Sequence, residues 1–193
     1  KMADEVGTEE ANGETPEEVE APKTPPGKAL RELVDGEFPG AILEQTAYED
    51  REDEVTFVLK DDALVGVATY LRDHPATSFK ILTDLTAAHY PGEETPFHVV
   101  YQLVSVDHGR LLRLKVKARE DQEVPTVSGV WSSANWMERE VYDLFGVRFK
   151  DHPDLRRIFL PDDWGSYPFR KDYPLEGRGE RVYSKPTRKE IGD

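Results

Sequence analysis

Two apolar segments separated by a short turn place the strongest constraint on how this chain can fold. Residues 97–106 form a dense apolar run, and residues 111–118 alternate between apolar and polar side chains. The apolar members of the second segment are Leu112, Leu114, Val116 and Ala118. Alternation with a period of two is typical of a strand with one buried face. The Asp107-His108-Gly109 sequence between the segments favours a hairpin turn, so the two are predicted to be antiparallel neighbours in a sheet.

The other segments up to residue 150 predict an α+β domain over residues 28–150. Strand-like patterns cover residues 41–48, 55–59 and 79–89, and the acidic stretch 49–53 is predicted to be a turn. Helical spacing of apolar residues predicts three helices: one over 28–38, one that begins after Asp61 or Asp62 and ends at Asp73, and one over 134–145. Expected N-caps are Asp61 or Asp62 for the second helix and Ser132, Ser133 or Asn135 for the third, which Gly146 ends. We expect a mostly antiparallel sheet with helices on one face.

The first 27 residues differ in character from the rest of the chain. They contain eight acidic residues against two lysines, a net charge of −6, within a chain whose formal net charge is −14. With almost no aliphatic residues, such a segment cannot bury enough apolar surface to offset its ordering entropy. We therefore expect a disordered acidic tail. The acidic chain also makes nucleic acids and anionic lipids poor direct partners.

Cysteine is absent from all 193 residues. The chain therefore has no disulfide, thiolate nucleophile, zinc–thiolate site or cysteine-ligated iron–sulfur cluster. No apolar run approaches the roughly 20 residues of a membrane-spanning helix. The acidic N-terminal segment resembles neither a signal peptide nor a transit peptide. We expect the chain to associate with a membrane only through another protein.

The last third of the chain, residues 151–193, is predicted to be an extended arm. Prolines recur every six to eight residues, at Pro153, Pro161, Pro168 and Pro174. This spacing disrupts both helices and central strands, yet the aromatic content is too high for ordinary disorder. An arm of this kind is expected to lie on a partner and to be largely mobile without it. The expected partner contacts are Arg156, Arg157, Trp164, Phe169, Arg170, Lys171 and Tyr173.

The titratable residues of the third helix and of the following turn give only weak indications of catalysis. Glu138 and Glu140 lie two positions apart, so their side chains diverge by about 200° around a helix. Arg139 and Asp143 lie four positions apart and are expected to pair with each other. His152 has no histidine at a metal-ligand spacing. Capping of a turn, or a bond to a nearby carboxylate, is the favoured role of His152.

The segment from Trp136 to Gly177 carries a long motif with irregular spacing. It reads Glu138-Arg139-Glu140, Asp143-Leu144-Phe145-Gly146 and His152-Pro153-Asp154-Leu155-Arg156-Arg157-Ile158. It continues with Pro161-Asp162-Asp163-Trp164 and Arg170-Lys171-Asp172-Tyr173-Pro174-Leu175. This segment resembles the C subunit, also called the thirty-kilodalton subunit, of respiratory NADH–quinone oxidoreductase, complex I.

The resemblance implies a structural role inside a large enzyme. Members of this family have no redox centre; NADH, FMN, iron–sulfur clusters and quinone bind to partner subunits. The resemblance places such a protein in the peripheral arm of a proton-pumping complex, against the D subunit, with the B and I subunits nearby. In bacteria the expected location is the cytoplasmic face of the inner membrane, as a peripheral component.

Three alternatives remain open at this stage. The chain could belong to a related quinone- or ferredoxin-linked complex with another electron donor. It could be a free-standing adaptor that binds proteins through its aromatic arm. It could also be a hydrolase or isomerase that uses Glu138, Glu140 and His152, which requires those side chains to converge on a pocket.

Overall fold

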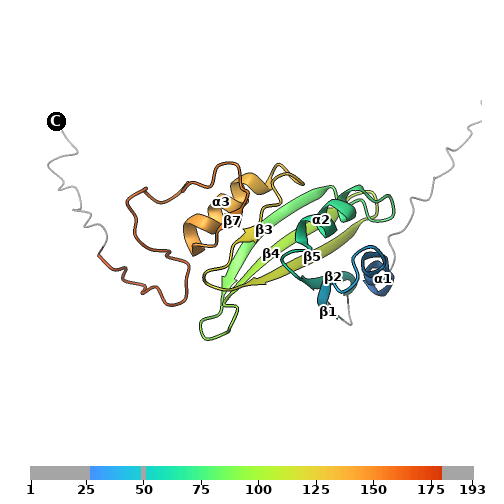
Figure 1. Cartoon of the computed structure of the whole chain (residues 1–193), viewed down its shortest axis with the longest axis horizontal. Helices are drawn as coiled ribbons and strands as arrows, with labels where there is room; N and C mark the ends of the chain where they lie inside the picture. The colour runs from blue at the N-terminus through green and yellow to red at the C-terminus, as the bar shows by residue number, and fades with distance from the viewer. Residues whose placement is uncertain (1–26, 49–50, 180–193) are drawn as a thin grey trace, which may run out of the picture.

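A five-stranded mixed sheet forms the centre of the structure (Figure 1). The computed structural model describes residues 27–48 and 51–179. The strands are β1 (Ile42–Tyr48), β2 (Arg51–Leu59), β3 (Ile81–His89), β4 (Phe97–Ser105) and β5 (Arg110–Ala118). Their order across the sheet is β1-β2-β5-β4-β3. The expected acidic tail lies outside the described residues except for Gly27, which begins the first helix.

The hairpin predicted from the apolar segments is confirmed as β4–β5. These strands pair antiparallel in unbroken register, with Tyr101 opposite Leu114 and Leu103 opposite Leu112. The alternating residues of β5 are buried on one face, while Arg113, Lys115 and Lys117 are only half-buried on the other. One face of the sheet therefore carries the core.

One strand pair departs from the antiparallel pattern. Short connections join β1 to β2, β3 to β4 and β4 to β5, and all three pairs are antiparallel. The chain leaves β2 through α2 (Leu64–Asp73) and enters the sheet again at the opposite edge, in β3. The returning β5 then lies beside β2 in the parallel direction. The mostly antiparallel α+β class is confirmed, with one parallel pair inside it.

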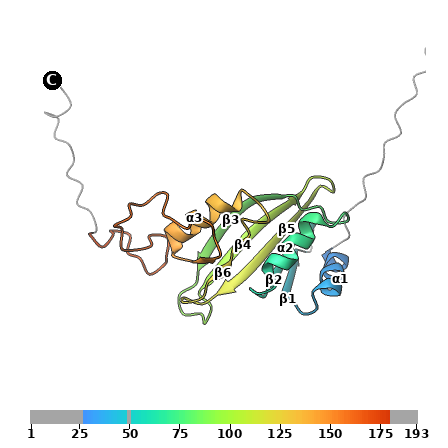
Figure 2. The ribbon, with the colours of Figure 1, turned by 45° about the horizontal axis from the view of Figure 1, so that its top comes forward.

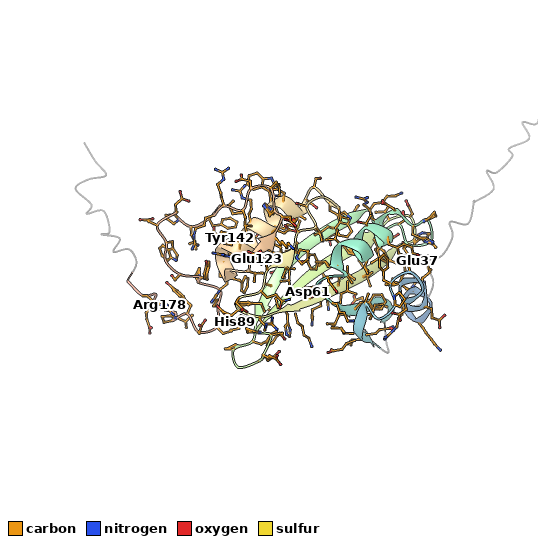
Figure 3. The ribbon with its side chains drawn as sticks, in the orientation of Figure 1. Glu37, Asp61, His89, Glu123, Tyr142 and Arg178 are labelled. Atoms are coloured by element: carbon orange, nitrogen blue, oxygen red, sulfur yellow. The ribbon has the colours of Figure 1, made fainter. Side chains whose placement is uncertain are left out.

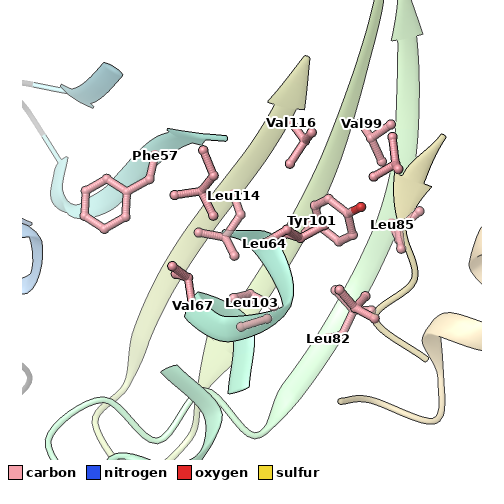
Figure 4. Close-up of a cluster of buried hydrophobic side chains, with 14 of the residues drawn as sticks. Phe57, Leu64, Val67, Leu82, Leu85, Val99, Tyr101, Leu103, Leu114 and Val116 are labelled. Carbon is pink, nitrogen blue, oxygen red and sulfur yellow. The ribbon is translucent and has the colours of Figure 1, made fainter. Parts of the chain in front are cut away.

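The core lies between the sheet and its helices, as Figure 4 shows for α2. Leu64 and Val67 of α2 pack over Phe57, Leu114 and neighbouring side chains, all of which are buried. Leu30 and Val34 bring α1 (Gly27–Glu37) into the same core. Each buried side chain of this size contributes about 1.5–3 kcal/mol of transfer free energy.

The third helix, α3 (Ala134–Phe145), lies at the β3 edge of the sheet, opposite α1 (Figure 2). It ends where expected, because Gly146 adopts a left-handed conformation with φ +80° and its N–H bonds to the carbonyl of Tyr142. Two short strands, β6 (Val124–Pro125) and β7 (Phe149–Lys150), pair in parallel next to it. None of the helices in the described part of the chain is both long and apolar enough to cross a bilayer.

Several local expectations are wrong. Residues 51–53 belong to β2 rather than to a turn, because pairing with β1 supplies backbone hydrogen bonds that override weak local preferences. The N-cap of α2 is Ala63, and the Asp61 carboxylate instead accepts a hydrogen bond from Gln122 at 2.7 Å. For α3 the expected N-cap position, Ser133, is confirmed, but its side chain makes no capping bond; its hydroxyl donates to the Leu82 carbonyl at 3.4 Å.

Candidate docking arm and its anchor on α3

The described part of the arm, residues 151–179, contains no helix or strand and passes along α3 (Figure 1). The expectation that prolines prevent regular structure there is confirmed for these residues. Because such a segment makes no ladder of its own, its position depends on individual contacts with the α+β domain. The contacts are concentrated at the C-terminal half of α3 and at the end of β3.

The Asp143 carboxylate is the main anchor. The consecutive N–H groups of Ile158, Phe159 and Leu160 donate to its Oδ2 atom at 3.0, 2.7 and 3.0 Å. Burial by itself would raise the pKa of Asp143. The hydrogen bonds from Leu160, Phe159, Ile158 and Arg157 outweigh that effect and lower the pKa. The ionised carboxylate therefore accepts hydrogen bonds from three consecutive backbone N–H groups. These groups lie in a proline-rich segment and have no partners in a helix or strand.

Arg157 completes this anchor from the arm side. Its guanidinium donates to Asp143 Oδ1 at 2.8 Å and to the Asp143 carbonyl at 3.1 Å. It also donates to the carbonyl of Trp164 at 2.8 Å, which closes the loop between residues 157 and 164. The side chain of Asp143 is fully buried and that of Arg157 is only 11% exposed. A buried pair of this kind fixes position, since the loss of one partner leaves an uncompensated charge.

The Tyr167 ring contacts two guanidinium groups. The Cζ atom of Arg157 is 5.1 Å from the ring centroid and that of Arg170 is 4.7 Å from it. Cation–π contacts of this length are attractive. A Cβ atom on Gly146 would lie 2.6 Å from this ring and 2.7 Å from Arg170. Gly146 is thus required twice, for its positive φ and for the close approach of the arm.

A second set of contacts attaches the arm further along. Arg170 donates to the Phe145 carbonyl at 2.6 Å and forms an ion pair with Glu120. The N–H of Phe169 donates to the Leu144 carbonyl at 3.1 Å. The N–H of Lys171 donates to Nδ1 of His89 at 3.0 Å, and Figure 3 shows His89 at the end of β3 beside the arm.

The expected pair between Arg139 and Asp143 is wrong. Arg139 donates to the carbonyls of Arg156 and Arg157 at 3.1 and 3.4 Å and lies over the Trp136 ring at 4.6 Å. Helical spacing permits an Arg139–Asp143 pair. The arm, however, supplies four donor groups to the Asp143 carboxylate, the Arg157 guanidinium and three backbone N–H groups, whereas the helix could supply only the Arg139 guanidinium. Both residues therefore hold the arm rather than each other.

Glu138, Glu140 and His152 do not converge on a common pocket. Glu138 is fully buried and accepts hydrogen bonds from Thr126 and Val127, whereas Glu140 is exposed. His152 bonds to the Asn135 carbonyl at 3.1 Å and accepts the N–H of Asp154 at 3.0 Å, which confirms its expected role in a turn. Within the described ranges, no group of three His, Asp or Glu side chains is placed to hold a metal ion.

The remaining predicted contact residues differ in how far they are exposed to solvent. Arg156 is exposed and pairs with Asp154 at 2.6 Å. Trp164 and Tyr173 are half-buried, and the side chains of Lys171 and Pro153 are exposed. Phe169 is 58% exposed, with one edge against Phe145 at 5.7 Å between ring centroids.

Two exposed aromatic residues were not among the expected partner contacts. Trp136 is 63% exposed on α3 and Phe159 is 64% exposed on the arm. Trp136 could have been found, because it is a large aromatic residue outside the apolar stripe of its helix. His89 and Glu120 contact arm residues that are 82 and 50 positions away in the sequence. No pattern among neighbouring residues could have predicted these contacts.

Comparisons with known proteins identify the family of the chain. The family model described as "Respiratory-chain NADH dehydrogenase, 30 Kd subunit" matches residues 57–179, from β2 to the arm. The chain is 41% identical over 167 residues to the NADH-quinone oxidoreductase C subunit of Paramagnetospirillum magneticum, covering 85% of this chain and 83% of that protein. It is 45% identical over 154 residues to the corresponding protein of Trichlorobacter lovleyi, covering 79% and 92%. The chain belongs to the family of the 30-kDa subunit of respiratory-chain NADH dehydrogenase, which is the C subunit of NADH-quinone oxidoreductase.

Proposed function

We propose that this chain is a non-catalytic subunit of a proton-pumping NADH–quinone oxidoreductase that docks on its neighbours through α3 and the arm. The observation that carries the proposal is a set of large apolar side chains left exposed to solvent on α3 and on the arm attached to it. Trp136, Phe159 and Phe169 are each more than half exposed, and Leu175 is fully exposed. Aromatic residues on a preorganised surface are typical anchors of protein interfaces.

The attachment of the arm favours docking over a free, flexible tail. Asp143 and Arg157 hold residues 157–160 against α3, and Arg170 holds the next stretch. A partner that binds this surface has little conformational entropy to remove, which strengthens binding. The partner proposed is the D subunit, with the B and I subunits nearby, in the peripheral arm of the complex. NADH, FMN, the iron–sulfur clusters and quinone are then held by those partner subunits.

A role as an independent hydrolase or isomerase has less support. Both oxygens of the Glu138 carboxyl group are engaged by Thr126 and Val127, and both nitrogens of His152 are engaged by backbone groups. Glu140 is exposed to solvent and does not join them. Substrate could reach Glu138 or His152 only after the turn and loop around them opened.

Copurification of variants with the other subunits tests the proposal. The double variant Trp136→Ser, Phe159→Ser should fold as the natural chain does and lose most of its incorporation into the complex. Leu111→Ser is the matched control, since Leu111 is 48% exposed on β5, away from α3 and the arm. Truncation after Phe149 should also abolish incorporation.

Full incorporation of the double variant would show that docking does not use these aromatic residues. Incorporation of the truncated chain would place docking in the α+β domain. Equal loss for the double variant and for Leu111→Ser would point to a general effect of surface substitutions.

A further inference from the structure

Glu138 is a fully buried carboxyl group at the point where the arm leaves the α+β domain. Its Oε2 atom accepts the Thr126 hydroxyl at 2.5 Å, and its Oε1 atom accepts the Val127 N–H at 2.8 Å. His152 Nε2, from the turn that begins the arm, lies 3.8 Å from Oε2. One carboxyl group thus bonds α3 to the loop 126–128 and lies next to the turn 151–154.

Among the described residues, no lysine or arginine pairs with this carboxyl group, and its one ionisable basic neighbour is His152 at 3.8 Å. The hydrogen bonds of His152 go to backbone groups: its Nδ1 atom accepts the N–H of Asp154, and its Nε2 atom bonds to the Asn135 carbonyl. Arg139, next to Glu138 on α3, is directed to the carbonyls of Arg156 and Arg157. Asp143, the other buried carboxylate of α3, is neutralised by Arg157 and not by a group near Glu138.

Tyr101 of β4 is another neighbour of Glu138. Its hydroxyl is buried and has no hydrogen-bond partner among the described residues. Burial raises the pKa of Tyr101 well above its usual range, and the charge of Glu138 raises it further. Tyr101 is therefore a neutral neighbour that stays protonated at any physiological pH, and it supplies no positive charge.

A pair of hydroxyl groups links the buried carboxyl group to solvent. Thr126 Oγ1 lies 2.8 Å from Ser128 Oγ and accepts the N–H of Ser128 at 3.1 Å. Thr126 and Ser128 line an open hollow between α2, the N-terminal end of α3 and the turn at Asp151. Hydroxyl groups donate and accept at once, so a proton that leaves Glu138 can be relayed through Thr126 to Ser128 by reorientation of two O–H bonds.

We propose that Glu138, Thr126 and Ser128 form a buried proton-binding site that exchanges one proton with solvent through this hollow. When the site is protonated, the Glu138 O–H donates to Thr126, whose own O–H turns to Ser128. When the site is ionised, both O–H bonds reverse direction and Thr126 donates to Glu138. The hydrogen-bond partners are the same in both states, so the loop stays attached while the buried charge changes.

The electrostatics of the site support proton binding near neutral pH. Burial raises the pKa of Glu138 to about 7, and the hydrogen bonds from Thr126 and Val127 only partly offset this effect. A folded-state pKa above the unfolded value stabilises the folded chain most at low pH, below the unfolded pKa. That contribution is lost as the pH rises through the folded pKa. The stability of the chain should therefore fall between about pH 4.5 and 7 because of this residue.

Carbon-13 NMR of the full chain, labelled at glutamate carboxyl groups and titrated from acid to alkaline pH, tests the site directly. One resonance should titrate with a midpoint near 7 and disappear in Glu138→Gln. Glutamine keeps the acceptor for Val127 and can donate to Thr126, so this variant preserves the packing. The Val127 and Asp154 amide resonances should follow the same midpoint in the natural chain.

Two further variants separate the site from general effects. Thr126→Val removes a hydrogen bond that favours the ionised carboxylate, so the midpoint should move upward. Glu140→Gln, two residues away and exposed, should leave the midpoint unchanged. A Glu138 resonance that titrates near 4.5 would overturn the proposal, as would a near-neutral titration that survives in Glu138→Gln. The titration is measured on the chain alone, so it fails or succeeds independently of docking.

Discussion

Substitution of Asp143 by asparagine tests the anchor between α3 and the arm. The two side chains have the same shape, but asparagine has one oxygen and no charge. If that oxygen takes the position of Oδ2, the N–H groups of residues 158–160 keep an acceptor, and the amide nitrogen faces the guanidinium of Arg157. If the amide is reversed, its nitrogen faces the three backbone donors. Either orientation places donors against donors in a buried position.

The expected loss of stability follows from the burial of the pair. Removal of one partner from a buried ion pair costs about 3–5 kcal/mol. Arg157 keeps its bond to the Trp164 carbonyl and its contact with Tyr167, so the lower end of that range applies. We expect Asp143→Asn to lower the free energy of unfolding by about 3 kcal/mol. In a chain of this size the midpoint of thermal unfolding should fall by about 6–12 °C.

Urea unfolding of the purified chain, with limited proteolysis of the arm, measures this effect. Asp154→Asn is the matched control: Asp154 also pairs with an arginine at 2.6 Å, but the Asp154 and Arg156 side chains are 46% and 72% exposed. An exposed pair contributes about 0–1 kcal/mol. If both variants changed stability and proteolysis equally, Asp143 would not be the residue that holds the arm.

Three further outcomes follow from the same contacts. Gly146→Ala should lower the free energy of unfolding, measured by urea unfolding, by about 2 kcal/mol, because alanine adds about 1 kcal/mol of strain at a left-handed φ and its Cβ displaces Tyr167. Gly129→Ala is the control and should have a much smaller effect, because the space around Gly129 is open. The lowered pKa of Asp143 contributes stability that is present above its unfolded pKa and is lost as the pH falls through the folded pKa. The protection of the 158–160 amides, measured as the exchange rate relative to an unfolded peptide at the same pH, should therefore decrease below about pH 4. Arg156→Glu should weaken copurification with partner subunits while leaving chain stability within about 1 kcal/mol, because Arg156 is exposed; a variant that copurified normally would remove Arg156 from the interface.

The sequence determined the elements that depend on local pattern. The alternation in residues 111–118, the dense run before it and the turn between them sufficed for β4 and β5. The apolar spacing of α3 and the glycine at its end fixed the bounds of that helix. These features are local, because strand and helix periodicities and a positive φ are properties of neighbouring residues.

The tertiary structure decided what lies next to what. The parallel pairing of β2 with β5 depends on which edge of the sheet the chain reaches after α2, and no local pattern records that choice. The partner of Asp143 likewise depended on tertiary contacts, because an i,i+4 arginine and an arm arginine 14 residues away are equally compatible with the sequence. Three aligned backbone donors make the arm the stronger partner. The burial of Glu138 without a lysine or arginine partner arises in the same way among the described residues, since the side chains that surround it come from β4, the loop before α3 and the turn after it.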